Sequence, residues 1–237
     1  HVVTESGAET VNVADTLGIA LPREIAGLVA FLIDRVPAFR EGKATVSVHC
    51  HNDSGLALAN TLAAIEAGAG QAEVTVLGLG ERAGNAALEE LAAIMCTHPK
   101  RYPREKPLDR EALTRASRLV ASFAGTGLSP LKPVTGWNVR AHASGIHQQG
   151  LSRDEATYRS VYGPTSKDRI VLTRHSGRAG VIAYLSRYLA PGPDGNPDSA
   201  IIDRILDALK GDAPPAGLTE ILALAQVPDL LIPESFS

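Results

Sequence analysis

The stretch VSVHCHNDSGLALAN, residues 46–60, joins a run of alternating valines to an apolar helical pattern through a polar segment. The valines favour an extended strand, and the periodic apolar residues after Gly55 favour a helix. His49 and His51 are two residues apart, so both imidazoles point to the same face if they lie on a strand. The stretch therefore predicts a βα unit whose strand ends in a polar edge.

Two further units of the same kind flank this one. We predict strands over 10–15, 44–49 and 72–79, and helices from Pro22 to about Arg35, from about 55 to 67, and over 85–95. Three consecutive βα units are typical of a parallel sheet, with the polar residues gathered after the carboxyl ends of the strands. An α/β barrel and an open Rossmann-like sheet both place their ligands at that edge, so this pattern alone does not choose between them.

The regular alternation stops after residue 98. A linker rich in Pro, Lys and Arg covers 97–109, and a helix is predicted over 110–124. Two more helical segments, 177–189 and 198–210, are separated by a turn-rich loop. The second half of the chain is therefore expected to be mainly helical.

Composition excludes several classes of protein. The chain has 237 residues, is 44% hydrophobic and carries a formal net charge of -3, so we expect a globular protein without the basic surplus that binds nucleic acid. No apolar run is long enough for a membrane span, and two cysteines do not make a disulfide framework, so we expect no membrane partner and a cytoplasmic location. The only methionine is Met95. We therefore expect a piece of the protein to precede His1.

The two histidines allow two interpretations. His49 and His51 can offer two ring nitrogens to one divalent ion. Alternatively, one histidine ends the strand and the other is solvated, which is the more frequent situation for an isolated His-x-His pair. Cys50 points to the opposite face and is expected to be a small buried residue.

The loop GLGERAGN, residues 78–85, also allows two interpretations. Backbone N–H groups of a glycine-rich loop before a helix can hold an anion, but such a loop is more often a tight βα turn. Its spacing matches neither the Walker pattern nor the dinucleotide fingerprint. Asn85 is the candidate N-cap of the helix that follows.

Taken together, residues 49–90 resemble the 2-isopropylmalate synthase and homocitrate synthase family of acyl-CoA condensing enzymes. The segments VNVADTLG (11–18), ASGIHQQG (143–150) and HSGR (175–178) are similar to other signatures of that family. The resemblance implies an α/β fold: the last three βα units of a (β/α)8 TIM barrel, followed by small, mainly helical subdomains. The implied domains are the barrel part at 1–108, a linker and helical subdomain contributing to the active site at 109–180, and a small helical subdomain at 181–237.

The resemblance also implies a divalent metal ion, Mn2+, Mg2+ or Zn2+, held by His49, His51 and Asn85. An Asp from the first barrel strand would complete the protein ligands, and that strand is not in this sequence. We therefore expect the chain to be a part of the enzyme, or one half of a split enzyme, that is inactive alone because the amino-terminal half barrel is missing.

The remaining site residues follow from the same resemblance. Thr16 would contact the carboxylate of the 2-oxo acid. His147 would act as the acid/base that reaches the other subunit of a homodimer, and Tyr158 would work beside it, although Tyr162 is an alternative because the spacing to the next proline differs from the family pattern. Glu81 is expected to help order the substrate together with Arg82, and a simple surface ion pair is the alternative.

Within the family, GERAGNAALEE and the Gln in SGIHQQG favour condensation of acetyl-CoA, the co-substrate, with 2-oxoisovalerate in leucine biosynthesis. Homocitrate synthase, which uses 2-oxoglutarate, and citramalate synthase are the alternatives among the synthases. A lyase of the hydroxymethylglutaryl-CoA type is disfavoured because that group has a Cys in the glycine loop. A non-enzymatic alternative is a degenerate barrel that serves as an assembly or regulatory subunit.

Overall fold

The computed structural model describes residues 2–103, 109–154, 156–158, 169–186, 195–211 and 221. The described chain divides into two compact units, one ending at Gly136 and the other beginning at Trp137. Each unit has its own hydrophobic cluster. The three-part domain division expected from the sequence stays a prediction.

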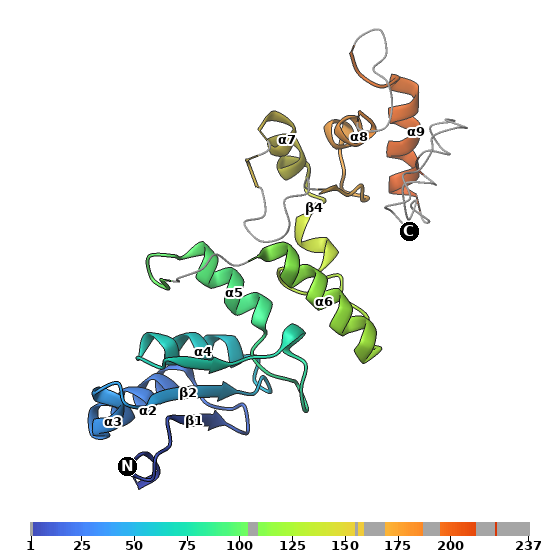
Figure 1. Ribbon diagram of the computed structural model, residues 1–237. Coiled ribbons are helices and arrows are strands. Elements are labelled where there is room, and N and C mark those ends of the chain that lie inside the picture. Colours follow the sequence, from blue (N-terminus) through green and yellow to red (C-terminus); the bar gives the residue numbers. More distant parts are fainter. Residues whose placement is uncertain are drawn as a thin grey trace. The chain divides into compact units, whose positions relative to one another are not determined.

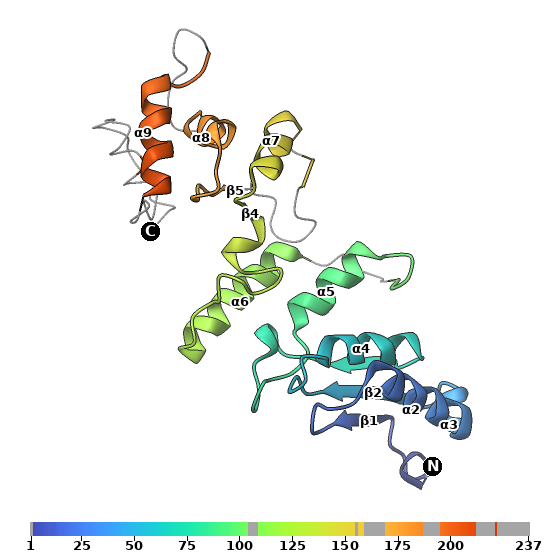
Figure 2. The ribbon, with the colours of Figure 1, turned by 180° about the vertical axis from the view of Figure 1, so that it is seen from behind.

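The first unit contains a parallel sheet with its strands in chain order. Figure 1 shows β1 and β2 side by side with α2 and α4 next to them, and Figure 2 shows the same elements from behind. The predicted α/β class with parallel strands is confirmed. The elements are α1 (Val2–Glu5), β1 (Thr10–Asp15), α2 (Pro22–Arg35), α3 (Pro37–Arg40), β2 (Thr45–Cys50), α4 (Ala57–Glu66) and β3 (Gln71–Glu73).

The central strand β2 is buried on both of its faces. Val46, Val48 and Cys50 are at most 3% exposed on one face, and Ser47 is fully buried on the other. Burial of both faces is typical of a strand in a parallel sheet that is covered by crossover helices. The predicted burial of Cys50 is confirmed.

The first two helices also agree with the prediction, within one or two residues at their ends. Pro22 occupies the first turn of α2, where its missing N–H costs no hydrogen bond. The carboxylate of Glu24 accepts a hydrogen bond from the N–H of Leu21 at 2.8 Å. Ile25 and Val29, one turn apart, pack on the same cluster as the valines of β2.

The third βα unit differs from the prediction. The expected strand over 72–79 is wrong beyond Glu73, because β3 ends there and a 3-10 turn, η1 (Val76–Gly78), follows. Leu77 has φ 63° and Gly78 has φ 68°, and neither value is compatible with an extended strand.

The helix after this turn begins later than predicted. It is α5 (Leu88–Thr97), and its N-cap is Ala87, so the prediction that Asn85 caps this helix is wrong. Asn85 instead donates its backbone N–H to the carbonyl of Gly78 at 2.9 Å. This hydrogen bond closes the loop and makes Asn85 part of it.

The last helix of the first unit is α6 (Arg110–Ala124), which confirms the predicted helix. The carboxylate of Asp109 accepts a hydrogen bond from the N–H of Ala112 at 2.9 Å and caps the helix start. Gly125, with φ 65°, ends the helix in the left-handed conformation. The segment that follows, up to Gly136, belongs to the same unit.

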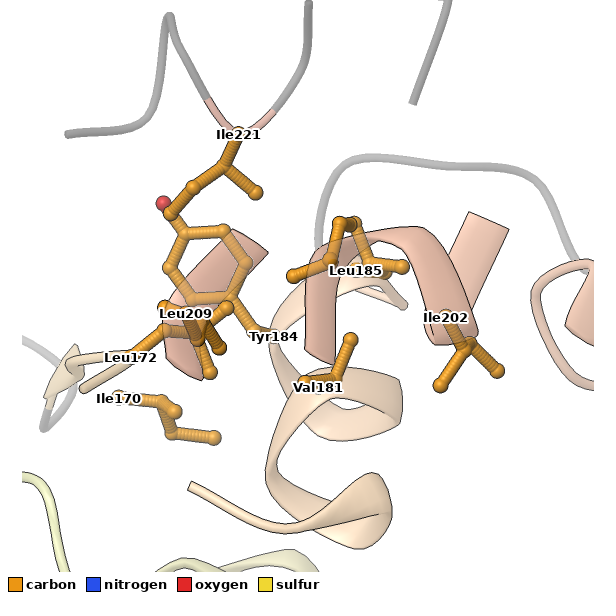
Figure 3. Packing of buried hydrophobic residues seen from close by; sticks show 9 residues of the cluster. Ile170, Leu172, Val181, Tyr184, Leu185, Ile202, Leu209 and Ile221 are labelled. Atoms are coloured by element: carbon orange, nitrogen blue, oxygen red, sulfur yellow. The ribbon is translucent and has the colours of Figure 1, made fainter. Parts of the chain in front are cut away.

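The second unit packs its last two helices around an apolar cluster. Figure 3 shows Val181 and Leu185 of α8 beside Ile202 and Leu209 of α9. Full burial of each such side chain contributes about 1.5–3 kcal/mol. The predicted helix over 198–210 is confirmed by α9 (Ser199–Lys210). The one over 177–189 is confirmed as far as Leu185 by α8 (Arg178–Leu185), and residues 187–189 lie outside the described part of the chain. The described elements of this unit are η2 (Trp137–Arg140), β4 (Ala141–His142), α7 (Gly145–Arg153), β5 (Arg169–Ile170), α8 (Arg178–Leu185) and α9 (Ser199–Lys210).

The N-cap of α8 is Gly177. The hydroxyl oxygen of Ser176, the residue before it, accepts a hydrogen bond from the N–H of Thr173 at 2.9 Å and closes the preceding turn. None of the helices within the described residues is long and apolar enough to cross a membrane.

Candidate metal centre

Backbone hydrogen bonds join the loops that follow the three strands of the first unit. The N–H of Asn52 donates to the carbonyl of Gly84 at 2.9 Å, which connects the loop after β2 to the loop after β3. The N–H of Ser54 donates to the carbonyl of Gly18 at 3.1 Å, which connects it to the loop after β1. The three loops therefore form one edge at the carboxyl ends of the strands, where α/β proteins place their sites.

His51 lies at the centre of this edge. It forms an isolated antiparallel bridge with Asn85, and its Nδ1 lies 3.3 Å from the carbonyl oxygen of Gly84. Since a carbonyl can only accept, this contact requires the proton on Nδ1. The other ring nitrogen, Nε2, is then an acceptor that can bind a metal ion.

His49 lies next to it, with the ring centroids of the two histidines 5.0 Å apart. The Nδ1 of His49 is 3.1 Å from a carboxylate oxygen of Glu73, close enough for an ion pair although the geometry is not that of a hydrogen bond. Glu73 is the direct neighbour of His49 in the parallel register of β2 and β3. A carboxylate at Nδ1 is a common outer-shell partner of a metal-binding histidine.

Asn85 supplies the most informative observation in this loop. The residue is 9% exposed, and its Nδ2 donates to the carbonyl of Leu79 at 3.2 Å. Its Oδ1 is buried without a hydrogen-bond partner among the described residues. An unsatisfied buried acceptor costs about 1–3 kcal/mol. An amide oxygen is, however, an ordinary ligand for a divalent cation. Two imidazoles and this oxygen therefore fit such an ion.

Two glycines of the loop are required by close packing around Asn85. A Cβ at position 80 would lie 2.1 Å from Nδ2 of Asn85, and one at position 84 would lie 2.0 Å from the carbonyl oxygen of Gly78. Gly84 also has φ 83°, which side-chain-bearing residues rarely adopt. These glycines are explained by the tight turn that holds Asn85.

Arg82 is the main polar connection on the outside of the edge. Its guanidinium donates two hydrogen bonds to the carboxylate of Asp53, at 2.9 and 3.1 Å, and one to the carbonyl of Thr16 at 2.7 Å. These hydrogen bonds hold the pKa of Asp53 below its ordinary value. Arg82 therefore ties together the loops after all three strands.

Two predicted substrate-binding residues lie at the same edge. The side chain of Thr16 is exposed at the end of β1. Glu81 is 86% exposed and 3.9 Å from Arg82, so its ion pair is weaker than the pair that Arg82 makes with Asp53. The sequence had suggested Glu81 as the partner of Arg82, and Asp53 was missed because only the fold brings it there.

The candidate site contains fewer charged ligand residues than a complete metal centre built from such residues would have. Within the described residues, no group of three or more His, Cys, Asp or Glu side chains has the arrangement needed to hold a metal ion. The carboxylate of Asp15, the last residue of β1, accepts hydrogen bonds from the N–H groups of Ile19 and Ala20, at 3.2 and 3.3 Å. The candidate ligands here are therefore His49, His51 and Asn85.

The second unit brings the two predicted acid/base residues together. The rings of His147 and Tyr158 stack with centroids 4.2 Å apart and an interplanar angle of 25°. A Cβ at Gly150 would lie 2.7 Å from the Tyr158 ring, so the glycine lets the tyrosine lie against α7. Both residues are exposed. The alternative tyrosine, Tyr162, lies outside the described residues.

Comparison with known proteins finds a family and individual relatives that this chain resembles in sequence. The sequence profile of the HMGL-like family matches residues 1–120. The chain is 42% identical over 188 residues to the 2-isopropylmalate synthase of Sediminispirochaeta smaragdinae, covering 78% of this chain and 37% of that enzyme. It is 46% identical over 182 residues to the 2-isopropylmalate synthase of Methylacidiphilum infernorum, covering 75% and 35%. The chain thus spans about a third of the length of the curated relatives it matches.

Among solved structures, the chain is similar to the HMG-CoA lyase of Bacillus subtilis. The two sequences are 25% identical, and the match covers 53% of this chain and 41% of the lyase with a TM-score of 0.45.

Proposed function

The chain belongs to the HMGL-like family, and we propose that it provides the metal-binding edge of a 2-isopropylmalate synthase, which condenses acetyl-CoA with 2-oxoisovalerate. The identity of 42–46% to proteins of that name supports the proposal. The single observation that carries it is that the buried Oδ1 of Asn85, beside His51, has no hydrogen-bond partner within the described part of the chain. A donor set of two imidazoles and an amide oxygen suits Mn2+, Mg2+ or Zn2+.

The residues around the metal site have distinct tasks in this proposal. His49, His51 and Asn85 supply ligand atoms, while Glu73 and the carbonyl of Gly84 orient the two imidazoles. A bound divalent ion supplies Lewis-acid polarisation of the carbonyl of the 2-oxo acid. The orientation of the two imidazoles is therefore fixed before the substrate binds.

The residues at the rim of the edge hold the substrate. The exposed hydroxyl of Thr16 is proposed to donate a hydrogen bond to the carboxylate of the 2-oxo acid, and Glu81 is proposed to face the substrate beside it. Arg82 is less suited to substrate binding, because its guanidinium is already engaged by Asp53 and by the carbonyl of Thr16. Its task is to keep the loops in place.

Proton transfer is assigned to the second unit. His147 is proposed to accept a proton from the methyl group of acetyl-CoA, with the stacked Tyr158 beside it. The resulting carbon nucleophile attacks the carbonyl carbon of the 2-oxo acid, the new alkoxide is protonated, and water cleaves the thioester to release CoA. We propose that His147 performs this proton transfer from acetyl-CoA across the interface of a homodimer.

The test is the release of CoA, in the presence of Mg2+ or Mn2+, by the complete enzyme of which this chain is proposed to be a part. We expect release from acetyl-CoA with 2-oxoisovalerate, little with 2-oxoglutarate or pyruvate, and none after chelation of the metal. The Asn85→Ala variant should lose the activity. Preference for 2-oxoglutarate or pyruvate would replace the proposed substrate with that of a homocitrate or citramalate synthase, and metal-independent release would contradict the mechanism.

A further inference from the structure

Glu89, in the first turn of α5, is completely buried. Glutamate is rarely found fully buried unless it has partners. One carboxylate oxygen of Glu89 accepts a hydrogen bond from the N–H of Leu77 at 2.9 Å. Leu77 has φ 63°, a left-handed conformation that costs about 1–2 kcal/mol for a residue with a side chain. The buried carboxylate therefore holds a turn that is unfavourable by itself.

That turn directly supports Asn85. The two residues after Leu77 provide both of the carbonyls that position the asparagine: Gly78 accepts its backbone N–H at 2.9 Å, and Leu79 accepts its Nδ2 at 3.2 Å. The direction of Oδ1 follows from these two hydrogen bonds. A displacement of the turn would therefore move the proposed ligand atom.

A lysine from a distant part of the same unit lies within ion-pair distance of one oxygen of the buried carboxylate, although that oxygen, Oε1, accepts no hydrogen bond among the described residues. The Nζ of Lys132, which follows α6, lies 2.6 Å from a carboxylate oxygen of Glu90 and 3.4 Å from one of Glu89. The side chains of Lys132 and Glu90 are only 20% and 18% exposed. A fully buried carboxylate beside a second, partly buried one would be strongly unfavourable without a cation.

The lysine and the asparagine also border the same space. A cavity of about 70 Å³ is lined by Leu77, Asn85, Glu90 and Lys132, among other residues. The contacts run from Lys132 to Glu89, from Glu89 to Leu77, and from the turn to Asn85.

We infer that Glu89 and Lys132 are positioning residues that set the orientation of Asn85 toward the metal ion. The inference rests on the proposed metal site and deepens it. Neither residue is a ligand or contacts the substrate in this account. If Glu89 and Lys132 position Asn85, substituting them should lower metal affinity by more than any loss of folding stability accounts for. A purely structural role predicts no such excess.

The test is a titration of the purified protein with Mn2+ alone, followed by the electron paramagnetic resonance signal of the free ion, together with thermal unfolding of each metal-free variant. Glu89→Gln and Lys132→Met should each weaken Mn2+ binding about 10-fold or more, as loss of an outer-shell partner commonly does. Lys132→Arg keeps the positive charge and should restore most of the affinity. The double variant should lose less than the product of the two single losses, because both act through one contact.

Arg101→Met is the matched control. Arg101 lies after the C-terminal end of α5, and its guanidinium donates two hydrogen bonds of 2.7 Å to the carboxylate of Glu66 in the same unit. The substitution removes this ion pair. Arg101 has no contact with the turn at 76–79 among the interactions of the described residues, so Mn2+ affinity should be unchanged.

A second variant keeps the inference testable if Lys132→Met does not fold. Leu77→Gly relieves the left-handed conformation, so Glu89→Gln should cost less Mn2+ affinity in the Leu77→Gly background than in the unaltered protein. An equal cost in both backgrounds would overturn the inference.

The other outcomes are equally distinct. Folded Glu89→Gln and Lys132→Met variants that bind Mn2+ within about twofold of the unaltered protein would overturn the inference, since a positioning effect is larger. If the unaltered protein bound no Mn2+, the metal site would be wrong and the inference with it. If the affinities change as expected but the complete enzyme releases no CoA with 2-oxoisovalerate, the inference stands and the proposed reaction is wrong.

Discussion

His51 and Asn85 lie opposite each other in an isolated antiparallel bridge, so the backbone fixes an imidazole of the loop after β2 against an amide of the loop after β3. The amide oxygen has no hydrogen-bond partner among the described residues. A replacement of similar size without that oxygen should therefore separate stability from metal binding.

We predict that Asn85→Leu removes metal binding with little loss of stability in metal-free protein. The variant loses one hydrogen bond, worth about 0.5–1.5 kcal/mol, and also removes a buried unsatisfied acceptor, worth about 1–3 kcal/mol. Thermal unfolding with and without Mn2+ measures both effects. Saturating Mn2+ should raise the Tm of the unaltered protein and leave that of Asn85→Leu unchanged. An equal rise in both would show that Asn85 is not a ligand.

Glu73 should influence the metal through His49 without being a ligand. Glu73→Gln removes the negative charge 3.1 Å from Nδ1 of His49, and we expect metal affinity to fall about 10-fold. The control is Glu41→Gln, which removes an exposed carboxylate paired with Lys43 before β2. Calorimetric titration with Mn2+ checks the prediction, and equal affinities of the two variants would refute it.

Gly84 and Gly42 form a matched pair for testing the turn. Both have a left-handed backbone, with φ 83° and 69°, but only at Gly84 would a Cβ meet another atom within 4 Å. We expect Gly42→Ala to cost about 1–2 kcal/mol for its conformation alone. Gly84→Ala should cost several kcal/mol more, because the carbonyl of Gly78 must move. Urea unfolding gives both values; similar costs would mean that the loop is not closely packed.

The Asp53–Arg82 pair predicts how stability depends on pH. Hydrogen bonds from Arg82 lower the pKa of Asp53 in the folded protein, so the pair stabilises the fold above the ordinary pKa of aspartate, about 3.9, and this contribution disappears as the pH falls through the lowered pKa. Denaturant unfolding from pH 7 to pH 3 should therefore show Asp53→Asn less stable than the unaltered protein near neutrality. The difference should become smaller as the pH falls below the ordinary pKa of aspartate. A constant difference would contradict this assignment.

The sequence was sufficient where local pattern and burial agree. The alternating valines around Ser47, Pro22 at a helix start and Asp109 at another helix start each specify their element without help from distant residues. The pattern at 72–79 failed for a physical reason. Its Val and Thr residues favour a strand, but Glu89 bonds to Leu77 and the glycines allow a tight turn that a strand pattern does not encode.

The sequence predicted only part of the candidate site, because a local pattern does not encode the contacts that the fold makes. His49 and His51 are two residues apart, so the sequence itself places them on one face. Glu73 reaches the site through strand register and Lys132 from a distant loop, while Asp53, two residues after His51, is paired with Arg82 only by the fold. All three are residue types that are ordinary on protein surfaces. Only the register of β2 and β3 would have pointed to Glu73.

The measurement that tests the central claim most directly is the pulsed electron paramagnetic resonance spectrum of Mn2+ bound to protein labelled with 15N-histidine. If His49 and His51 are both ligands, the spectrum should show coupling to two histidine nitrogens, and His49→Gln and His51→Gln should each remove one. A spectrum without histidine coupling, or one that neither substitution changes, would contradict the proposed metal centre.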